Sequence, residues 1–297
     1  MRQGATAGQK CKMIDYAIID VGSNSVRLMT LADGKVLYKT LETTRLGEGI
    51  AQTPVLKKEA IERTALAVFA FYKKAKTEGA KSVYAFATAA VRSAENGDAF
   101  VKRVKELCPL AVDVVSGERE AELGILGALT GDGAVLDIGG ASTELVVRKE
   151  GEIVYKKSLD IGVVRLKDAC GDRIELLKET CKNFAAKFSD APVKTAVAIG
   201  GTATTIGAVA AGLKEYSSEK VTGVKISANK MRELSKTLLS MPVEEIEKIP
   251  CVLKNRADII GGGVTLLSAI MEELGLLEVT ISDADNLEGY AKTLNLL

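Results

Sequence analysis

The stretch AVLDIGGASTELVV, residues 134–147, is an apolar run that meets an aspartate and several small residues before apolar residues resume. The stretch YAIIDVGSNSVRLMTL, residues 16–31, has the same order of residue types near the N-terminus. The aligned pairs are Asp20 with Asp137, Gly22 with Gly139, Ser23 with Gly140, Ser25 with Ser142 and Arg27 with Glu144. A shared pattern of this length indicates one structural unit used twice, and we therefore predict two related domains.

The composition is that of a globular protein with ordinary cores. The chain has 297 residues, of which 47% are hydrophobic and only 4% aromatic, so Ala, Val, Ile and Leu must supply the cores. This length is enough for two domains. The net charge of +1 gives no reason to expect a nucleic-acid polymer or an acidic membrane surface as partner. No apolar run approaches the roughly 18 residues of a membrane span.

Histidine is absent from the chain, which excludes His-based triads, His general bases and His metal ligands. The five cysteines form no CxxC pair and are odd in number, a usage typical of reduced thiols in a cytoplasmic protein. The N-terminus has no apolar segment of the secretory type. We expect residues 1–14 to be a disordered leader.

Hydrophobic periodicity predicts the same order of elements in each half of the chain. In the first half we expect strands near 16–19, 26–31 and 36–44, followed by helix 57–77, strand 82–88, helix 96–107, strand 111–115 and helix 118–129. The second half begins again with strands near 134–136, 144–148 and 153–159, and its later strands lie at 195–199 and 278–281. Its predicted helices span 163–169, 174–188, 200–211, 228–240, 243–249, 256–274 and 286–294. Hairpin strands followed by βα units predict an α/β fold of mixed sheets flanked by helices. We place the domains at residues 15–121 and 122–297.

The two acidic loops have the residue types of a phosphate site. Glycine lets a ligand approach the backbone, successive N–H groups form a nest for phosphate oxygens, and an aspartate at a strand end can hold a divalent cation. Either loop alone is more typical of a hairpin turn with side-chain hydrogen bonds. The matched pair favours a phosphate clamp between two domains.

A third glycine-rich turn, Gly200-Gly201-Thr202, lies between a predicted strand and a helix. Free N–H groups at a helix start attract anions, although small residues also permit close packing of helix on sheet. The pattern is neither GxxxxGK[ST] nor GxGxxG, so it indicates neither a P-loop nor a dinucleotide site.

Five motifs resemble, in the same order, those of the exopolyphosphatase/guanosine pentaphosphate phosphatase (Ppx/GppA) family: IDVGSNSVRL, AFATAAVRSAENG, VVSGEREAELGILG, VLDIGGASTEL and AIGGTATT. The late stretches RADIIGGGVTLLSAIMEELG and VTISDADNLEGY resemble its C-terminal signature. The resemblance implies the actin-like ATPase superfamily fold, with two duplicated ribonuclease-H-like domains and an active site in the cleft between them. It implies metal-dependent hydrolysis of the terminal phosphoanhydride of inorganic polyphosphate, or of guanosine pentaphosphate (pppGpp).

The resemblance also implies roles for particular residues. Glu120 matches the base that orients the attacking water, and Arg92 matches an arginine that contacts phosphate. Asp137 and Glu144 match the acidic pair that holds Mg²⁺ or another divalent cation, and Asp20 faces them from the first loop as a third metal-binding candidate. The implied phosphate-binding residues are Gly22, Ser23, Asn24, Ser25, Arg27, Gly139, Gly140, Ser142, Thr143, Gly200, Gly201 and Thr202.

Two positions depart from the family pattern. Arg119 stands where the family usually has an acid, which leaves Glu118 as a second candidate for the base and adds a cation that could help to hold polyphosphate. Ala141 stands where a third glycine is common, and its methyl group matters only if that residue needs a positive φ.

Two other classes of function remain open from the sequence. An ATP-dependent kinase or ATPase with the same fold would need an adenosine pocket, and a kinase also a catalytic aspartate. A non-catalytic sensor of guanosine polyphosphates would not need Asp137, Glu144 and Glu120. A homodimer is the candidate oligomer.

Overall fold

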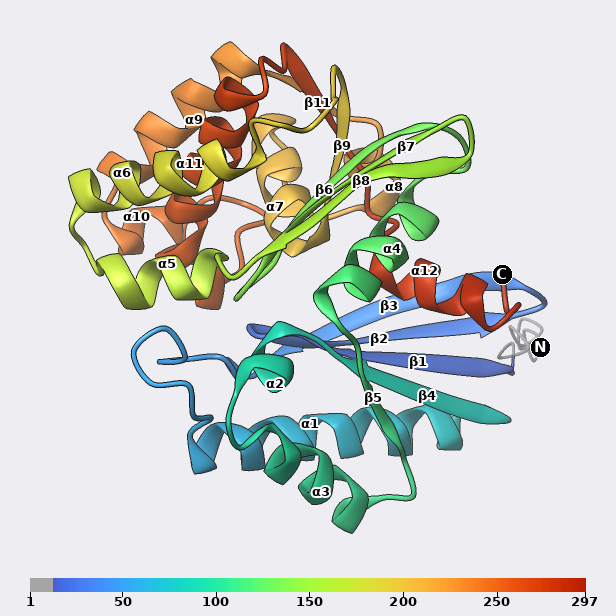
Figure 1. The fold of residues 1–297 in the computed structure, drawn as a ribbon. Coiled ribbons are helices and arrows are strands. Elements are labelled where there is room, and N and C mark those ends of the chain that lie inside the picture. Colours follow the sequence, from blue (N-terminus) through green and yellow to red (C-terminus); the bar gives the residue numbers. More distant parts are fainter. Residues whose placement is uncertain (1–12) are drawn as a thin grey trace, which may run out of the picture.

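The computed structural model describes residues 13–297 and forms two lobes, each built on one mixed β-sheet with helices packed on it (Figure 1). The strands of the first lobe are β1 (Tyr16–Val21), β2 (Ser25–Ala32), β3 (Lys35–Thr43), β4 (Ser82–Ala87) and β5 (Val112–Val114). Its helices are α1 (Lys58–Thr77), α2 (Ala89–Ser93) and α3 (Gly97–Leu107), and α4 (Gly117–Ala128) leads out of it.

The second lobe repeats this plan with additional helices. Its strands are β6 (Gly133–Ile138), β7 (Thr143–Lys149), β8 (Glu152–Leu159), β9 (Ala196–Ile199), β10 (Lys225–Ser227) and β11 (Glu278–Ile281). Its α-helices are α5 (Val163–Cys170), α6 (Ile174–Ala185), α7 (Gly200–Ala210), α8 (Ser218–Val221), α9 (Ala228–Ser240), α10 (Val243–Ile246) and α11 (Ala257–Glu273). The 3₁₀ turns Ala186–Phe188 and Lys254–Arg256 and the last helix, α12 (Asn286–Thr293), complete the chain.

The strand orders show the duplication directly. The first sheet runs β3-β2-β1-β4-β5, and the second runs β8-β7-β6-β9-β11-β10. In both sheets, an antiparallel meander of three strands is followed by two strands parallel to the first one: β4 and β5 in the first sheet, β9 and β11 in the second. The second sheet adds β10, which is antiparallel to β11. Asp20 pairs with Arg27 across the first hairpin as Asp137 pairs with Glu144 across the second. The predicted fold class and the predicted repeat are therefore confirmed.

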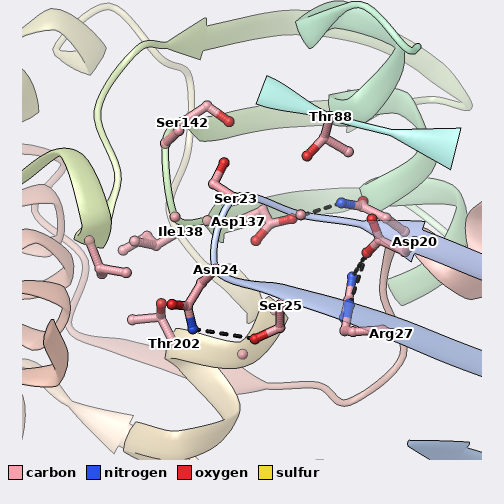
Figure 2. Close-up of a pocket in the computed structure, with 18 of the residues that line it drawn as sticks. Asp20, Ser23, Asn24, Ser25, Arg27, Thr88, Asp137, Ile138, Ser142 and Thr202 are labelled. Atoms are coloured by element: carbon pink, nitrogen blue, oxygen red, sulfur yellow. Dashed lines mark hydrogen bonds and ion pairs between the residues drawn. The ribbon is translucent and has the colours of Figure 1, made fainter. Parts of the chain in front are cut away.

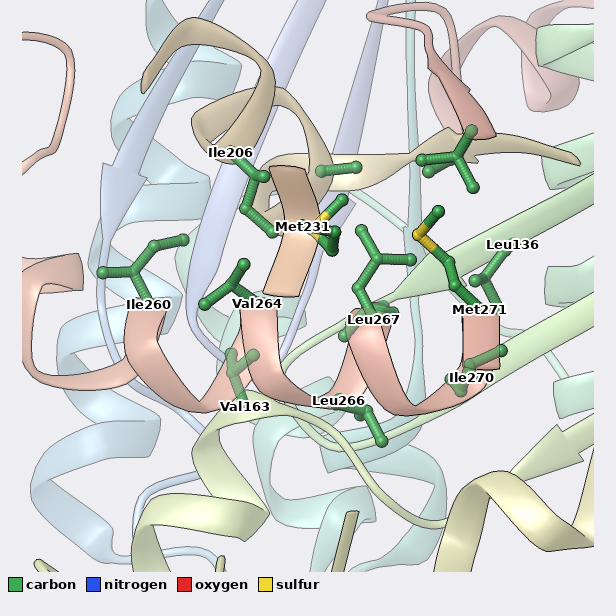
Figure 3. Packing of buried hydrophobic residues seen from close by; sticks show 14 of the residues in the cluster. Leu136, Val163, Ile206, Met231, Ile260, Val264, Leu266, Leu267, Ile270 and Met271 are labelled. Atoms are coloured by element: carbon green, nitrogen blue, oxygen red, sulfur yellow. The ribbon is translucent and has the colours of Figure 1, made fainter. Parts of the chain in front are cut away.

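Each lobe has its own hydrophobic core, and the larger one surrounds α11 (Figure 3). Val264, Leu266, Leu267 and Ile270 of this helix are completely buried. The helix is apolar on nearly all sides because other helices of the lobe and the second sheet enclose it, which is the pattern expected of a central helix. No helix within residues 13–297 has both the length and the apolar character needed to cross a membrane.

The predicted disordered leader lies mostly outside the described residues, which begin at Met13. At its end the prediction is wrong, because Ile14 is 3% exposed and its N–H group donates to the carbonyl of Glu78. The apolar side chain of Ile14 belongs to the core of the first lobe.

Helices α4 and α12 lie together between the two lobes (Figure 1). Leu123 of α4 packs with Leu287 of α12 and with Ile18 and Phe86 of the first sheet. Ile125 of α4 packs instead on the second sheet. The domain boundary that we predict between residues 121 and 122 falls inside α4, and α12 packs against the first lobe although it follows the second in sequence.

Glycines bring α4 and α12 into backbone contact. A Cβ atom at Gly127 would overlap the carbonyl of Asp285. We expect Gly127→Ala to lower the free energy of unfolding by about 1–3 kcal/mol, which is the usual cost of overpacking. A urea titration measures this difference. The control is Gly131→Ala, because a Cβ atom there meets no other group within 4 Å. Equal stability of the two variants would show that this close contact is not required.

Candidate active site

A cavity of about 90 Å³ lies where the two acidic hairpin loops face each other (Figure 2). We call residues 20–27 the first loop and residues 137–144 the second loop. The residues that line the cavity include Asp20, Gly22, Ser23, Asn24, Ser25, Arg27, Thr88, Glu120, Asp137, Gly139, Gly140, Ser142, Gly200, Gly201, Thr202, Arg256 and Asn286. The two loops, distant in sequence, thus share one cavity with the start of α7 and the start of α4.

The two loops have the same turn geometry. The N–H of Gly22 donates to the carbonyl of Ser25, and the N–H of Gly139 donates to that of Ser142, both at 3.0 Å. These two glycine N–H groups therefore close the turns and are not free donors to a phosphate. At the point of closest approach, a Cβ atom on Gly140 would lie 2.9 Å from Cβ of Ser23. The glycine allows the second loop to reach the first.

Four acidic side chains are buried around the cavity: Asp20 is 4% exposed, Glu120 6%, Asp137 8% and Glu144 2%. Burial raises the pKa of each one. For Asp137 burial and the nearby charges of Glu120 and Asp285 raise the pKa to about 8. The clustered carboxylates repel one another, and a cation among them would stabilise their charged forms.

Polar side chains orient each of these acids. The Nε atom of Arg27 donates to Oδ2 of Asp20 at 2.9 Å. Nη1 of Arg92 donates to Oε2 of Glu120 at 2.8 Å and also to the carbonyl of Val115. Nδ2 of Asn286 donates to Oδ2 of Asp137 at 3.0 Å, and the hydroxyl of Ser158 donates to Oε1 of Glu144 at 2.7 Å.

The donor set fits a magnesium ion that binds few protein ligands. Within residues 13–297 no group of three or more acidic or thiol side chains is arranged to hold a metal by itself. Mg²⁺ usually keeps several waters and takes one or two carboxylates together with substrate phosphates. Oδ1 of Asp20 and Oε2 of Glu144 are buried and have no hydrogen-bond partner in the described part of the chain. Such orphaned oxygens are the kind of ligand that the ion prefers.

Gly200 allows the third glycine-rich turn to approach Asp137. Its φ is +80°, and a Cβ atom there would overlap Oδ1 of Asp137. We expect Gly200→Ala to cost about 1–3 kcal/mol of stability through backbone strain and to displace the Asp137 carboxylate. A fall in unfolding temperature together with loss of activity would agree with this, whereas full activity would contradict it. Gly212→Ala is the control, because this glycine also has a positive φ, +63°, but no atom near its Cβ position.

Arg256 is a site residue that the sequence analysis did not identify. It is 9% exposed, and Nη1 donates to the carbonyl of Gly201 at 2.5 Å, while Nε is buried without a partner. No ion pair to it is found among the described residues. Burial and the nearby charge of Arg27 lower its pKa to about 10. A buried cation without a carboxylate is costly, which indicates that it is kept for an anionic ligand.

Three predicted site residues lie differently from the expected arrangement. Thr143 is fully buried, does not line the cavity, and donates its hydroxyl to the carbonyl of Ile161 at 2.6 Å. Its predicted phosphate contact is therefore wrong in this structure: side chains alternate along β7, so Thr143 points away from the acids that surround Glu144. Glu144 and Arg92 lie behind the cavity wall, where they contact Ser158 and Glu120.

The structure also settles the geometry of the two departures from the family pattern. Arg119 pairs with Glu122 at 3.3 Å and does not line the cavity, so it adds no cation there. Glu118 is 77% exposed and pairs with Lys156, which leaves Glu120 as the acid of this helix in the cleft. Ala141 has no positive φ, and its buried methyl group packs in the core of the first lobe.

A second cavity of about 500 Å³ adjoins the first and shares Arg27, Gly200, Gly201 and Arg256 with it. Its outer wall carries partly exposed apolar side chains, with Leu41 39%, Tyr216 48% and Leu253 44% exposed. The combined site thus has a small acidic and glycine-rich end and a larger amphipathic end.

Comparison with known proteins agrees with this architecture. The model of the Ppx/GppA phosphatase family matches residues 29–292. The chain belongs to this family. Exopolyphosphatase 2 of Mycobacterium tuberculosis is 30% identical over 312 residues, which cover 94% of this chain and 98% of that protein. A guanosine-5'-triphosphate,3'-diphosphate pyrophosphatase of Vibrio vulnificus is 30% identical, with 93% of this chain and 58% of that protein covered. The crystal structure of the Aquifex aeolicus Ppx/GppA member has a TM-score of 0.77 at 29% identity and covers 95% of this chain and 97% of its own.

Proposed function

We propose that this Ppx/GppA member is an exopolyphosphatase, which hydrolyses the terminal phosphoanhydride of inorganic polyphosphate and releases orthophosphate. The observation that carries this proposal is the shared cavity, in which two acidic loops meet Glu120 and Arg256, a buried arginine with no ion-pair partner among residues 13–297. The cavity of about 90 Å³ is small beside the adjoining one of about 500 Å³, and we assign it to one terminal phosphate group and its water.

The reaction needs positioning and charge neutralisation more than covalent help from the protein. In our proposal, loop N–H groups and hydroxyls of the two hairpins bind the terminal phosphate, and Arg256 binds the phosphate next to it. Glu120, held by Arg92, accepts a hydrogen bond from the water and orients it for attack in line with the breaking P–O bond. The shortened polyphosphate leaves as the product.

We further propose Mg²⁺ as the cofactor, held by Asp137 and Asp20, with Glu144 close behind them. When bound, the ion neutralises charge on the phosphate oxygens. The buried oxygens without partners on Asp20 and Glu144 support this assignment. We also propose a cytoplasmic location, which the free thiols of the described cysteines support.

The test compares linear polyphosphate with cyclic trimetaphosphate, which has the same anhydride bonds but no terminal phosphate. We expect Mg²⁺-dependent release of orthophosphate from the linear chains and none from the ring. Release from ATP alone would favour an ATPase instead. Binding of these phosphates without any release, by a folded preparation, would favour a sensor.

The second cavity favours guanosine pentaphosphate as an alternative substrate. Its amphipathic wall and its volume of about 500 Å³ suit a nucleoside whose phosphates reach the first cavity past Arg256. If pppGpp is a substrate, Tyr216→Ala should raise KM for pppGpp and leave KM for polyphosphate unchanged. An equal effect on both substrates would argue against a nucleoside in this cavity.

A further inference from the structure

Two consecutive residues at the start of α12, Asp285 and Asn286, reach the two acidic loops separately. Asp285 is 3% exposed and its Oδ2 accepts from Nη1 of Arg27, in the first loop. Asn286 is 4% exposed, and Nδ2 donates to Oδ2 of Asp137, in the second loop. The same short segment thus contacts an acidic loop of each lobe.

The segment itself is held rigidly. Asp285 and Glu288 form a capping box, in which Oδ1 of Asp285 accepts from the N–H of Leu287 and Oε2 of Glu288 accepts from the N–H of Asp285. Lys39 of β3 then pairs with Glu288 at 2.6 Å. The capping box fixes residues 285 and 286 relative to α12, and Lys39 fixes α12 relative to the first sheet.

The contact with Arg27 determines what this arginine can do. Its guanidinium lies between Asp20 and Asp285, and although burial alone would lower its pKa, the two carboxylates raise it well above the usual value. An arginine held from two sides presents its remaining N–H edge in one orientation only. Asp285 therefore fixes the direction from which Arg27 meets a phosphate.

The contact with Asp137 determines which of its oxygens faces the cation. Asn286 occupies Oδ2, and Gly200 lies against Oδ1. A carboxylate that can rotate binds a cation less well than one that is held, and loss of such an outer hydrogen bond typically costs 10–100-fold in metal affinity or activity. Neither Asp285 nor Asn286 is in a position that the acidic repeat or its glycines would reveal.

We propose that Asp285 and Asn286 are positioning residues for the reaction, each acting on one lobe: Asp285 aligns Arg27 with the phosphate, and Asn286 aligns Asp137 with the cation. The proposal rests on the proposed function. In this proposal the start of α12 positions the two loops relative to each other. Substitution of Asn286 should therefore weaken cation binding, and substitution of Asp285 should lower kcat.

Asn286→Ala tests the second contact with Mn²⁺ alone as the probe, followed by the signal of free Mn²⁺ in electron paramagnetic resonance. We expect Mn²⁺ affinity to fall at least tenfold, and the Mg²⁺ concentration for half-maximal activity to rise by a similar factor, with KM for polyphosphate changed less than threefold. Asn286→Leu repeats the measurement with the volume kept, in case the alanine variant does not fold.

Asp285→Asn tests the first contact. Asparagine is as good a helix cap as aspartate, so the capping box is retained while the charge facing Arg27 is lost. Because the charge of Asp285 also acts on Asp137, we expect Mn²⁺ affinity to fall less than tenfold, and less than in Asn286→Ala. We expect kcat for polyphosphate to fall about 10–100-fold, the scale of a small misplacement near the reacting atoms.

The matched control is Lys292→Met, at the other end of α12. Lys292 donates to the carbonyl of Leu126 in α4 at 2.7 Å and touches neither loop. We expect Lys292→Met to lower the unfolding temperature and to leave both the Mn²⁺ affinity and kcat for polyphosphate unchanged. The proposal is overturned if Asn286→Ala, Asp285→Asn and Lys292→Met all show the same defects in proportion to lost stability, or if Asn286→Ala binds Mn²⁺ as the wild type does. Failure of the wild type to hydrolyse polyphosphate would instead contradict the proposed function, and the Mn²⁺ comparison would still stand.

Discussion

Glu120→Gln is expected to lower kcat for orthophosphate release by about 10²–10⁴-fold, the usual contribution of a positioned general base. Glutamine keeps the shape of the side chain and can still accept from Arg92, so the fold should remain intact. It cannot accept a proton from the attacking water. Initial rates of phosphate release and thermal unfolding, measured on the same preparation, separate the two effects.

Glu118→Gln is the matched control for this prediction. Both residues lie in the first turns of α4, but Glu118 is largely exposed and pairs with Lys156 outside the cavity. The control should retain wild-type activity. If Glu118→Gln were inactive and Glu120→Gln active, the assignment of the base would be reversed.

Arg256→Met is expected to lower kcat/KM for polyphosphate by about 10²–10³-fold, since a preorganised donor to the reacting phosphates is removed. Its unfolding temperature should stay level or rise, because burial of an unpaired guanidinium opposes folding. Arg256→Lys should recover little activity, because an ammonium cannot reproduce the planar fork of arginine.

The control is Arg232→Met, on the exposed side of α9. It should change neither activity nor stability appreciably. Unchanged activity in Arg256→Met would show that this buried arginine does not bind substrate. A large loss of stability together with lost activity would make it a structural residue.

Much of the fold could be predicted from the sequence because it is encoded locally and twice. The apolar runs that lead to Asp20 and Asp137 give the strands, and the repeated loop gives the duplication. Strand β10 (Lys225–Ser227) could not be predicted, because only Ile226 of its three residues is buried. Such a short segment has no recognisable hydrophobic pattern. Its pairing with β11 is decided by the tertiary structure.

The position of α12 could not be predicted, for a related reason. Its apolar residues indicate a helix, but not that Leu287 packs on the first lobe. That choice depends on the close contact with α4, which involves Gly127 and Gly289 and leaves no periodic signal.

That the two loops share one cavity could be predicted, because the repeat marks both of them. Arg256 was missed because its burial depends on α7, far away in sequence, although it begins the stretch RADIIGGG that carried the family resemblance. Thr143 was placed wrongly although the signal was present: next to Glu144 in a strand, it must face the other side. Asn286 lies in the stretch VTISDADNLEGY, but its contact with Asp137 could not be predicted because it depends on the placement of α12.

The central claim is that the two acidic loops together hold the phosphates and the cation in one cleft. The most direct test is a crystal structure with Mn²⁺ and a non-hydrolysable imidotriphosphate, in which the anomalous signal locates the metal. We predict the metal beside Asp20 and Asp137, with terminal phosphate oxygens contacted from both loops and Arg256 on the next phosphate. An ordered triphosphate bound elsewhere, with no metal between these aspartates, would contradict the account.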